Sequence, residues 1–133
     1  MYLIVVGAGN VSQQLISIVK EQGHQVAVIE KEAGKARSLM QQFDVRVFHG
    51  DIAQANILEE ADISNADAIV ATTKDDSVNL MAMVLGKHHG VQNLITMLRE
   101  KEHTEMFEKL GVQLLSDPEQ LIAQKLFSLI DDE

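Results

Sequence analysis

The first thirty residues constrain the fold of this chain more than any other stretch. Residues 3–6 and 26–29 are short apolar runs typical of buried strands. Between them lie a glycine-containing turn, residues 7–12, and a segment whose apolar residues recur at helical spacing. These apolar residues are Val11, Leu15, Ile18 and Val19. The order of strand, turn, helix and strand predicts one βαβ unit.

The turn has the spacing of a nucleotide-binding fingerprint, G-x-G-x-x-G, with serine in place of the third glycine. Gly7 would let the chain turn tightly out of the strand, and Gly9, which has no Cβ, would let a pyrophosphate approach the backbone. The amides and the positive dipole end of the following helix would then face the phosphates. Ser12 is small, so we expect close packing of helix on strand to be strained but feasible. A tight turn in an α/β domain that binds no nucleotide is the alternative.

An acidic residue ends the second apolar run at the distance that such sites require. Glu30 lies 23 residues after Gly7, close to the roughly 20 residues of dinucleotide-binding domains. Its carboxylate could accept hydrogen bonds from both hydroxyls of an adenosine ribose. It would repel a 2′-phosphate, so we expect NAD or NADH rather than NADP, although Lys31 weakens this preference. ATP and ADP stay open, because their ribose would be recognised in the same way.

Composition excludes several classes of function. The chain has 133 residues, enough for one domain with a core, and a net charge of −9. This charge argues against a nucleic-acid surface and against binding anionic lipid by charge. There is no cysteine, so we expect neither disulfides nor thiolate chemistry, as is usual in the cytoplasm. No apolar run approaches the ~20 residues of a membrane span, and the chain begins in an expected strand rather than a signal peptide.

Downstream, segments with helical and strand-like patterns alternate. We expect helices at about 32–43, 53–61, 78–88, 102–110 and 118–131, and strands at 45–48, 68–71, 93–97 and 112–115. This alternation predicts right-handed crossovers and a parallel sheet covered on both faces. The expected fold is a Rossmann-like, doubly wound, six-stranded parallel sheet in a single domain over residues 1–133. Strand order 3-2-1-4-5-6 follows if the glycine turn lies at the switch point.

Ligands of such sheets bind at the carboxyl ends of the strands. That rule selects Gly7, Glu30, Asp51, Thr72 and Arg99. Histidines give a weaker signal. His49, at a strand end, suits a hydrogen-bonded or solvent-facing residue better than a catalytic acid, and His88-His89 suits a helix C-terminus. No spaced set of zinc ligands occurs in the sequence, so we expect no metal site and no catalytic residues.

Short motifs lie next to the later strands. They are Gly50-Asp51, the segment 71–79 (Ala-Thr-Thr-Lys-Asp-Asp-Ser-Val-Asn), Leu110-Gly111-Val112 and Asp117-Pro118-Glu119. Together with the turn and Glu30, this set resembles the N-terminal lobe of RCK (regulator of potassium conductance) domains, over essentially the whole chain. These domains are the nucleotide-binding cytosolic subunits of Trk- and Ktr-type potassium uptake systems and the gating rings of some potassium channels. Longer members continue into a C-terminal lobe, so the chain is either part of a longer protein or a single-lobe protein.

The resemblance implies a role for each matching position. The pyrophosphate would lie against Gly7, Ala8, Gly9, Asn10, Val11 and Ser12. The adenosine half would lie against Glu30, Lys31, Asp51 and Ile52. The nicotinamide half, or the tail of another nucleotide, would lie against Thr72, Thr73 and Arg99.

Five of these residues also suit ordinary structural roles. Asp51 would serve as a helix N-cap, and Arg99 as a surface cation after a strand. Asp75, Asp76 and Asn79 suit the start of a helix, near its positive dipole end, better than a metal site.

The resemblance implies a regulatory, non-enzymatic domain. Nucleotide occupancy would change the shape of an assembly that controls an integral membrane potassium transporter or channel. The expected partners are an adenine nucleotide, further copies of the chain in a dimer or larger ring, and the membrane subunit. The protein would then lie in the cytoplasm, at the inner face of the membrane. An NAD-dependent oxidoreductase fragment and a metabolite-sensing Rossmann domain are the alternatives.

The last predicted helix has an unusually wide apolar face. At 100° per residue its apolar arc spans about 160°, against the ≳100° typical of a surface helix. The arc contains Leu129, Ile122, Leu126, Ile130, Ala123 and Phe127, with Leu121 outside it. Soluble monomers avoid such exposed strips. We therefore expect the helix to cross to a second copy in a homodimer, with burial in its own domain as the alternative.

Overall fold

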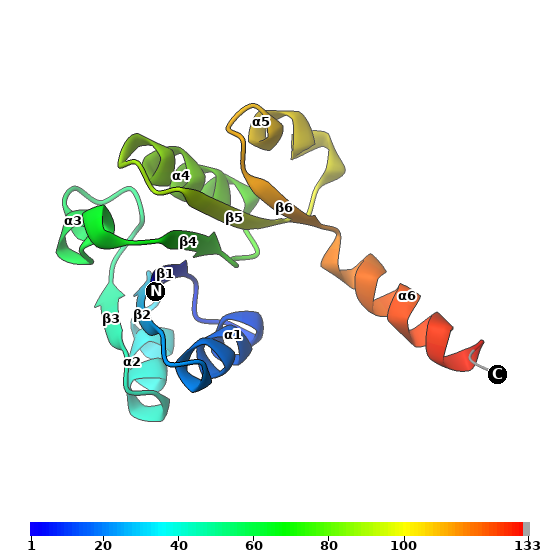
Figure 1. Ribbon diagram of the computed structural model, residues 1–133, viewed down its shortest axis with the longest axis horizontal. Helices are drawn as coiled ribbons and strands as arrows, with labels where there is room; N and C mark the ends of the chain where they lie inside the picture. The colour runs from blue at the N-terminus through cyan, green and yellow to red at the C-terminus, as the bar shows by residue number, and fades with distance from the viewer. Residues whose placement is uncertain (132–133) are drawn as a thin grey trace.

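The computed structural model describes residues 1–131 and confirms the predicted sheet (Figure 1). Its strands are β1 (Tyr2–Val6), β2 (Gln25–Glu30), β3 (Arg46–His49), β4 (Ala68–Ala71), β5 (Asn93–Leu98) and β6 (Gln113–Ser116). All neighbouring pairs are parallel, and the order is β3-β2-β1-β4-β5-β6, as predicted. The chain therefore reverses its direction of winding between β1 and β4, which lie side by side in the middle of the sheet.

Helices cover both faces of this sheet. They are α1 (Asn10–Glu21), α2 (Ala33–Gln42), α3 (Ile57–Glu60), α4 (Asp76–His88), α5 (Thr104–Glu108) and α6 (Pro118–Ile130), with short 3-10 helices η1 (Ile63–Asn65) and η2 (Lys101–His103). The segment predicted as a helix over 53–61 is mostly turn, and only its second half is helical. Asn56, with a left-handed φ of 70°, comes directly before that short helix.

The core consists of two apolar clusters, one on each face of the sheet. Leu3 and Val5 of β1 pack with α1 and α2, whereas Ile4 and Val6 pack with α3, α4 and α5. Side chains of a strand alternate between faces, so a strand buried on both sides must be apolar throughout. This explains the near-continuous apolar runs of β1 and β2.

The buried face of α1 includes only part of its apolar stripe. Val11 and Ile18 are 51% and 57% exposed, whereas Ser12, Ile16 and Val19 are buried. The helix therefore places Ser12, at the third glycine position, directly against the sheet. The Ser12 hydroxyl is buried and has no hydrogen-bond partner among the described residues.

Ser12→Ala is expected to raise the free energy of unfolding by about 1 kcal/mol, because it removes a buried hydroxyl that forms no hydrogen bond. Urea unfolding followed by circular dichroism measures the change. Ser17→Ala, in the same helix, is the control for the gain in helix propensity. If Ser12→Ala raised the free energy of unfolding no more than Ser17→Ala does, the result would contradict an unpaired hydroxyl at Ser12.

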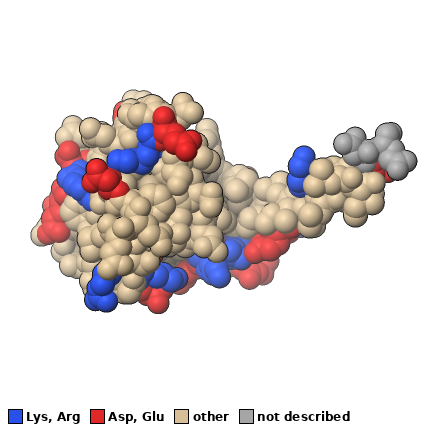
Figure 2. All heavy atoms as spheres, turned by 90° about the horizontal axis from the view of Figure 1, so that it is seen from below, with Lys and Arg blue, Asp and Glu red and all other residues tan. Residues whose placement is uncertain are grey.

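Helix α6 projects away from the rest of the domain (Figure 1). None of its residues is buried, and Ile122, Phe127 and Ile130 are 61%, 65% and 77% exposed. Much of its visible surface is uncharged (Figure 2). Burial of α6 in its own domain is therefore wrong for this structure. Across residues 1–131, no helix has both the length and the apolarity to cross a bilayer.

Candidate functional site

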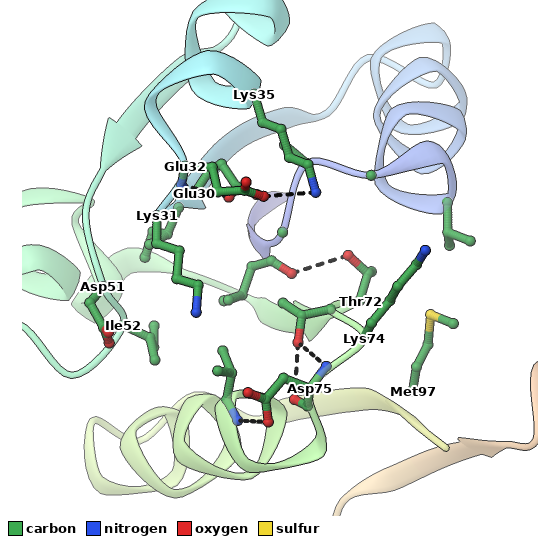
Figure 3. A pocket seen from close by; sticks show the side chains of 18 of the residues that line it. Glu30, Lys31, Glu32, Lys35, Asp51, Ile52, Thr72, Lys74, Asp75 and Met97 are labelled. Atoms are coloured by element: carbon green, nitrogen blue, oxygen red, sulfur yellow. Dashed lines mark hydrogen bonds and ion pairs between the residues drawn. The ribbon is translucent and has the colours of Figure 1, made fainter.

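A cleft of about 720 Å³ opens at the carboxyl ends of the central strands (Figure 3). It lies between β1 and β4, where doubly wound sheets bind ligands. The structure brings together twelve of the predicted site residues in its lining: Gly7, Ala8, Gly9, Asn10, Val11, Glu30, Lys31, Asp51, Ile52, Thr72, Thr73 and Arg99. Ser12, the remaining predicted site residue, does not line the cleft, because its side chain faces the sheet.

The two glycines of the turn after β1 differ in what they contribute. Gly7 has a φ of +111°, and a Cβ there would lie 2.8 Å from Thr72 Oγ1, so both conformation and space exclude a side chain. Gly9 has an ordinary φ of −81°, and no atom lies within 4 Å of the position of a Cβ. The backbone would therefore accept a side chain at position 9 without strain, and that side chain would enter the open cleft.

The first turn of α1 offers backbone donors to the cleft. Gly9 is the N-cap, and no side chain caps the helix. The first amides of a helix have no partner within the helix. Here they point, with the positive dipole end, toward the cleft, which is the arrangement that binds phosphate.

Glu30 provides a buried carboxylate at the end of β2. Only 7% of the residue is exposed, and the backbone amide of Glu32 donates a hydrogen bond to Oε2 (2.9 Å). This bond holds the carboxylate at the cleft. A buried charged acceptor in a cleft suits a ligand that presents hydroxyl donors.

The loop after β3 forms the neighbouring wall. Asp51 Oδ1 accepts a hydrogen bond from the Ala53 amide (2.8 Å), which stabilises a turn. The predicted N-cap role of Asp51 is wrong, because α3 begins only at Ile57. Ile52 is 4% exposed and gives this wall an apolar side chain. His49 Nε2 lies 3.1 Å from the Lys31 carbonyl, in the hydrogen-bonded role expected for it.

The opposite wall follows β4. The Thr72 hydroxyl donates to the Val6 carbonyl (3.1 Å), and Thr73 Oγ1 lies 2.6 Å from Asn79 Oδ1. Asn79 is fully buried, and its Nδ2 donates to the Thr73 and Met97 carbonyls (3.0 and 3.1 Å). Asn79 was expected only as a residue at the start of a helix. In the structure it also joins the ends of β4 and β5. Both hydroxyls are hydrogen-bonded within the protein, which fixes the shape of this wall.

Two adjacent acids begin α4 and have different roles. Asp75 is the predicted helix-start acid, since its Oδ1 accepts hydrogen bonds from the Ser77 and Val78 amides (2.9 and 3.4 Å). Asp76 is buried and points the other way, toward the chain after β5.

The Asp76 carboxylate accepts hydrogen bonds from the Arg99 and Glu100 amides (both 2.9 Å) and from His103 Nδ1 (2.8 Å). Burial raises the pKa of the Asp76 carboxyl, but these hydrogen bonds outweigh burial, so the pKa lies below its usual range. Asp76 thus anchors the backbone that carries Arg99.

Arg99 lies in the far half of the cleft. Its Nη1 donates to Glu119 Oε1 of α6 (2.7 Å), and 30% of its side chain is exposed. Its Nε is buried and has no hydrogen-bond partner among the described residues. Arg99 is therefore a partly exposed cation that is paired with an acid of α6.

Sequence reasoning missed several residues of the cleft. They are Gln13, Glu32, Lys35, Lys74, Val78 and Met97. Lys35 lies in the first turn of α2, and helical side chains lean toward the helix N-terminus. This tilt directs Lys35 back to the carboxyl edge of the sheet, and is the signal that could have found it. Its ion pair with Glu32 (2.9 Å) is exposed and therefore weak.

The lining of the cleft carries charges of both signs. Lys31 and Lys35, around the start of α2, and Lys74, after β4, line it together with Arg99 (Figure 3). These four cations match the four acids of the lining, in a chain whose net charge is −9. The cleft is therefore less acidic than the chain as a whole, which reduces the repulsion of anionic ligand groups. Residues 1–131 contain no group of three or more histidine or acidic side chains placed to hold a metal ion.

The fold and the cleft at its switch point define a Rossmann-type domain. The TrkA-N domain model matches residues 3–118, and the chain belongs to this family. This match confirms the family resemblance, to the N-terminal lobe of RCK domains, that the sequence motifs indicated.

Curated relatives support the assignment. The chain is 33% identical to the Trk system potassium uptake protein TrkA homolog of Methanothermobacter thermautotrophicus, over 98% of this chain and 60% of the relative. It is 31% identical to the homolog of Pyrococcus horikoshii, over 96% of this chain and 58% of the relative. The chain thus spans about three-fifths of the length of these relatives.

Solved structures share the fold. The TrkA-N domain of the inner membrane protein ybaL from Escherichia coli has a TM-score of 0.85 at 18% identity, over 96% of this chain and 95% of that chain. The GsuK channel bound to NAD has a TM-score of 0.76 at 20% identity, over 86% of this chain and 21% of that chain. The Kef C-terminal domain of Shewanella denitrificans in its AMP-bound form has a TM-score of 0.78 at 20% identity, over 98% of this chain and 82% of that chain.

Proposed function

We propose that this chain is the nucleotide-binding regulatory domain of a membrane potassium uptake system or channel. The observation that carries the proposal is the meeting, in one cleft, of the uncapped amides of α1 and the buried Glu30 carboxylate. Two kinds of similarity support it. The curated relatives are Trk system potassium uptake proteins, and the channel and Kef domain of the same fold were solved with NAD and AMP.

In this proposal the ligand is an adenine nucleotide, NAD(H) or ATP/ADP. The pyrophosphate lies against residues 7–12, to which Ser12 contributes only its backbone. Glu30 accepts hydrogen bonds from the ribose hydroxyls, and Lys31, Asp51 and Ile52 surround the adenosine half. Thr72, Thr73 and Arg99 face the rest of the ligand. The negative charge of Glu30 disfavours NADP.

The proposed role is regulatory rather than catalytic, and the proposed place of action is the cytoplasmic face of the membrane. Nucleotide occupancy would change the shape of an assembly of several copies that contacts the membrane subunit. Hydride transfer with a small alcohol or carbonyl compound would instead indicate the oxidoreductase alternative.

Calorimetric titration of the chain with NAD⁺, NADH, ATP and ADP in parallel tests the proposal. We expect saturable binding of one nucleotide per chain and no turnover of the bound ligand. Absence of binding by all four nucleotides would overturn the assignment of the cleft.

Glu30→Ala is expected to weaken binding of the adenine nucleotide by about 1.5–3 kcal/mol, the range for hydrogen bonds to a charged group. The same titration measures the loss. Glu59→Ala, an exposed acid on α3, is the control for the change in net charge. An affinity of Glu30→Ala equal to that of the control would remove Glu30 from the ribose site.

We also propose that α6 forms a homodimer through its exposed apolar arc. Phe127→Glu places a charge in this arc and is expected to convert a dimer at micromolar concentration to a monomer, because burying an unpaired charge is strongly unfavourable. Light scattering measures the mass in solution. Gln124→Glu, outside the arc of the same helix, should leave the dimer intact. A monomeric parent chain, or a dimeric Phe127→Glu variant, would remove α6 from the interface.

A further inference from the structure

Helix α6 joins the domain at a junction beside the cleft. The Asp117 amide donates to the Leu98 carbonyl (2.9 Å), which places the start of α6 next to the end of β5. In the first turn of the helix, Glu119 Oε1 accepts the hydrogen bond from Arg99 Nη1 (2.7 Å). Within residues 1–131 this is the one ion pair that connects α6 to the rest of the domain. Because no residue of α6 is buried, few other contacts hold its direction.

Arg99 belongs to both the cleft and this junction. Its backbone is anchored by the hydrogen bond to Asp76, whereas its side chain is partly exposed and lines the cleft. The Glu119 carboxylate is bound through Nη1, on the partly exposed part of the guanidinium. A guanidinium binds phosphate through two parallel hydrogen bonds. Arg99 can therefore bind either a phosphate in the cleft or the carboxylate of α6.

Glu119 supplies the acidic counterpart from outside the cleft. Its side chain is 64% exposed. The pKa of its carboxyl is lowered by its own backbone amide and by Arg99, with a smaller effect of Lys74, so it is ionised at neutral pH. Lys74 also lines the cleft. The positive charge in the far half of the cleft is thus partly neutralised by a residue of the projecting helix.

We propose that a nucleotide with phosphates beyond the first competes with Glu119 for Arg99, and that this competition couples the cleft to the direction of α6. Phosphate binding breaks the Arg99–Glu119 pair and releases the start of α6. By linkage, an α6 held against Arg99 lowers the affinity for the same nucleotide. The inference rests on the proposed nucleotide-binding function and adds its route of regulation. AMP, whose one phosphate is used at the glycine turn, would not compete.

Affinity measurements test the competition. Glu119→Gln is expected to bind ATP, or NAD⁺ where that is the preferred ligand, about two- to fivefold more tightly than the parent chain, the range for release of one exposed ion pair. AMP affinity should not change. Glu108→Gln, an exposed acid on α5, is the control for net charge. In an Arg99→Gln background, Glu119→Gln should have no further effect on affinity.

Distance measurements test the coupling to α6. The chain contains no cysteine, so Gln41→Cys on α2 and Ser128→Cys on α6 give a specifically spin-labelled pair, diluted with unlabelled chain to isolate intramolecular distances. ATP or NAD⁺ should shift or broaden the distance distribution of the parent, and AMP should not. Glu119→Gln should show the altered distribution without nucleotide.

These measurements distinguish failure of the competition or of the coupling from failure of nucleotide binding itself. Unchanged ATP and NAD⁺ affinity in Glu119→Gln would overturn the competition, and an unchanged distance distribution on nucleotide binding would overturn the coupling. Both results leave nucleotide binding intact. If neither ATP nor NAD⁺ binds the parent chain, the proposed function fails and the inference fails with it.

Discussion

Gly9→Val is expected to abolish nucleotide binding while the domain stays folded. The φ of −81° at Gly9 is accessible to valine, and no atom lies within 4 Å of the new Cβ. The branched side chain would occupy the space through which a pyrophosphate reaches the amides of α1. Loss of binding would therefore come from exclusion of the ligand rather than from a damaged turn.

Titration with NAD⁺ and ATP measures the loss, and circular dichroism establishes that the variant is folded. Gly34→Val is the matched control, because Gly34 also has open space at its Cβ position but does not line the cleft. A folded Gly9→Val chain that binds nucleotide as tightly as the parent would contradict the placement of the phosphates at α1.

Asp76→Ala is expected to lower the free energy of unfolding by about 3 kcal/mol or more. The substitution leaves two backbone amides and His103 without their acceptor, and each buried donor left unsatisfied costs about 1–3 kcal/mol. Urea unfolding at pH 7 measures the change. Asp75→Ala is the control, since loss of that exposed N-cap should lower the free energy of unfolding by much less.

The contribution of Asp76 should depend on pH in a defined direction. Its pKa is lower in the folded chain than in the unfolded chain, so the carboxylate stabilises the fold at pH values above the unfolded pKa of about 3.9. That stabilisation is lost as the pH falls through the folded pKa. The difference in stability between the parent and Asp76→Ala should therefore shrink below about pH 4. A constant difference between pH 7 and pH 3 would show that the charge of Asp76 is not responsible.

Local sequence was sufficient for the architecture. Apolar runs of strand length, separated by segments of helical period, permit little besides a parallel sheet with both faces covered. The glycine turn, placed after the first strand, then identified the switch point and the strand order. Gly7 and Glu30 were found in the same way, because a residue at the end of a parallel strand has its position set by the strand itself.

Side-chain environments beyond the strand ends needed the folded chain. Apolar residues at helical spacing did not show which stripe of α1 meets the sheet. Asp51 proved to stabilise a turn, since the helix start depends on how residues 52–56 pack. Lys35 and Lys74 reach the cleft from segments that only folding brings together.

The local pattern of polar and apolar residues therefore determined the sheet, its order and the edge that holds the cleft, because each depends on periodicities of a few residues. The tertiary structure alone decided that Asp76 is buried among three donors, that Arg99 is shared between the cleft and Glu119, and that α6 leaves the domain. These features join residues 20 to 27 positions apart in sequence. Their free energy depends on distance and desolvation in the folded state, which no local pattern encodes.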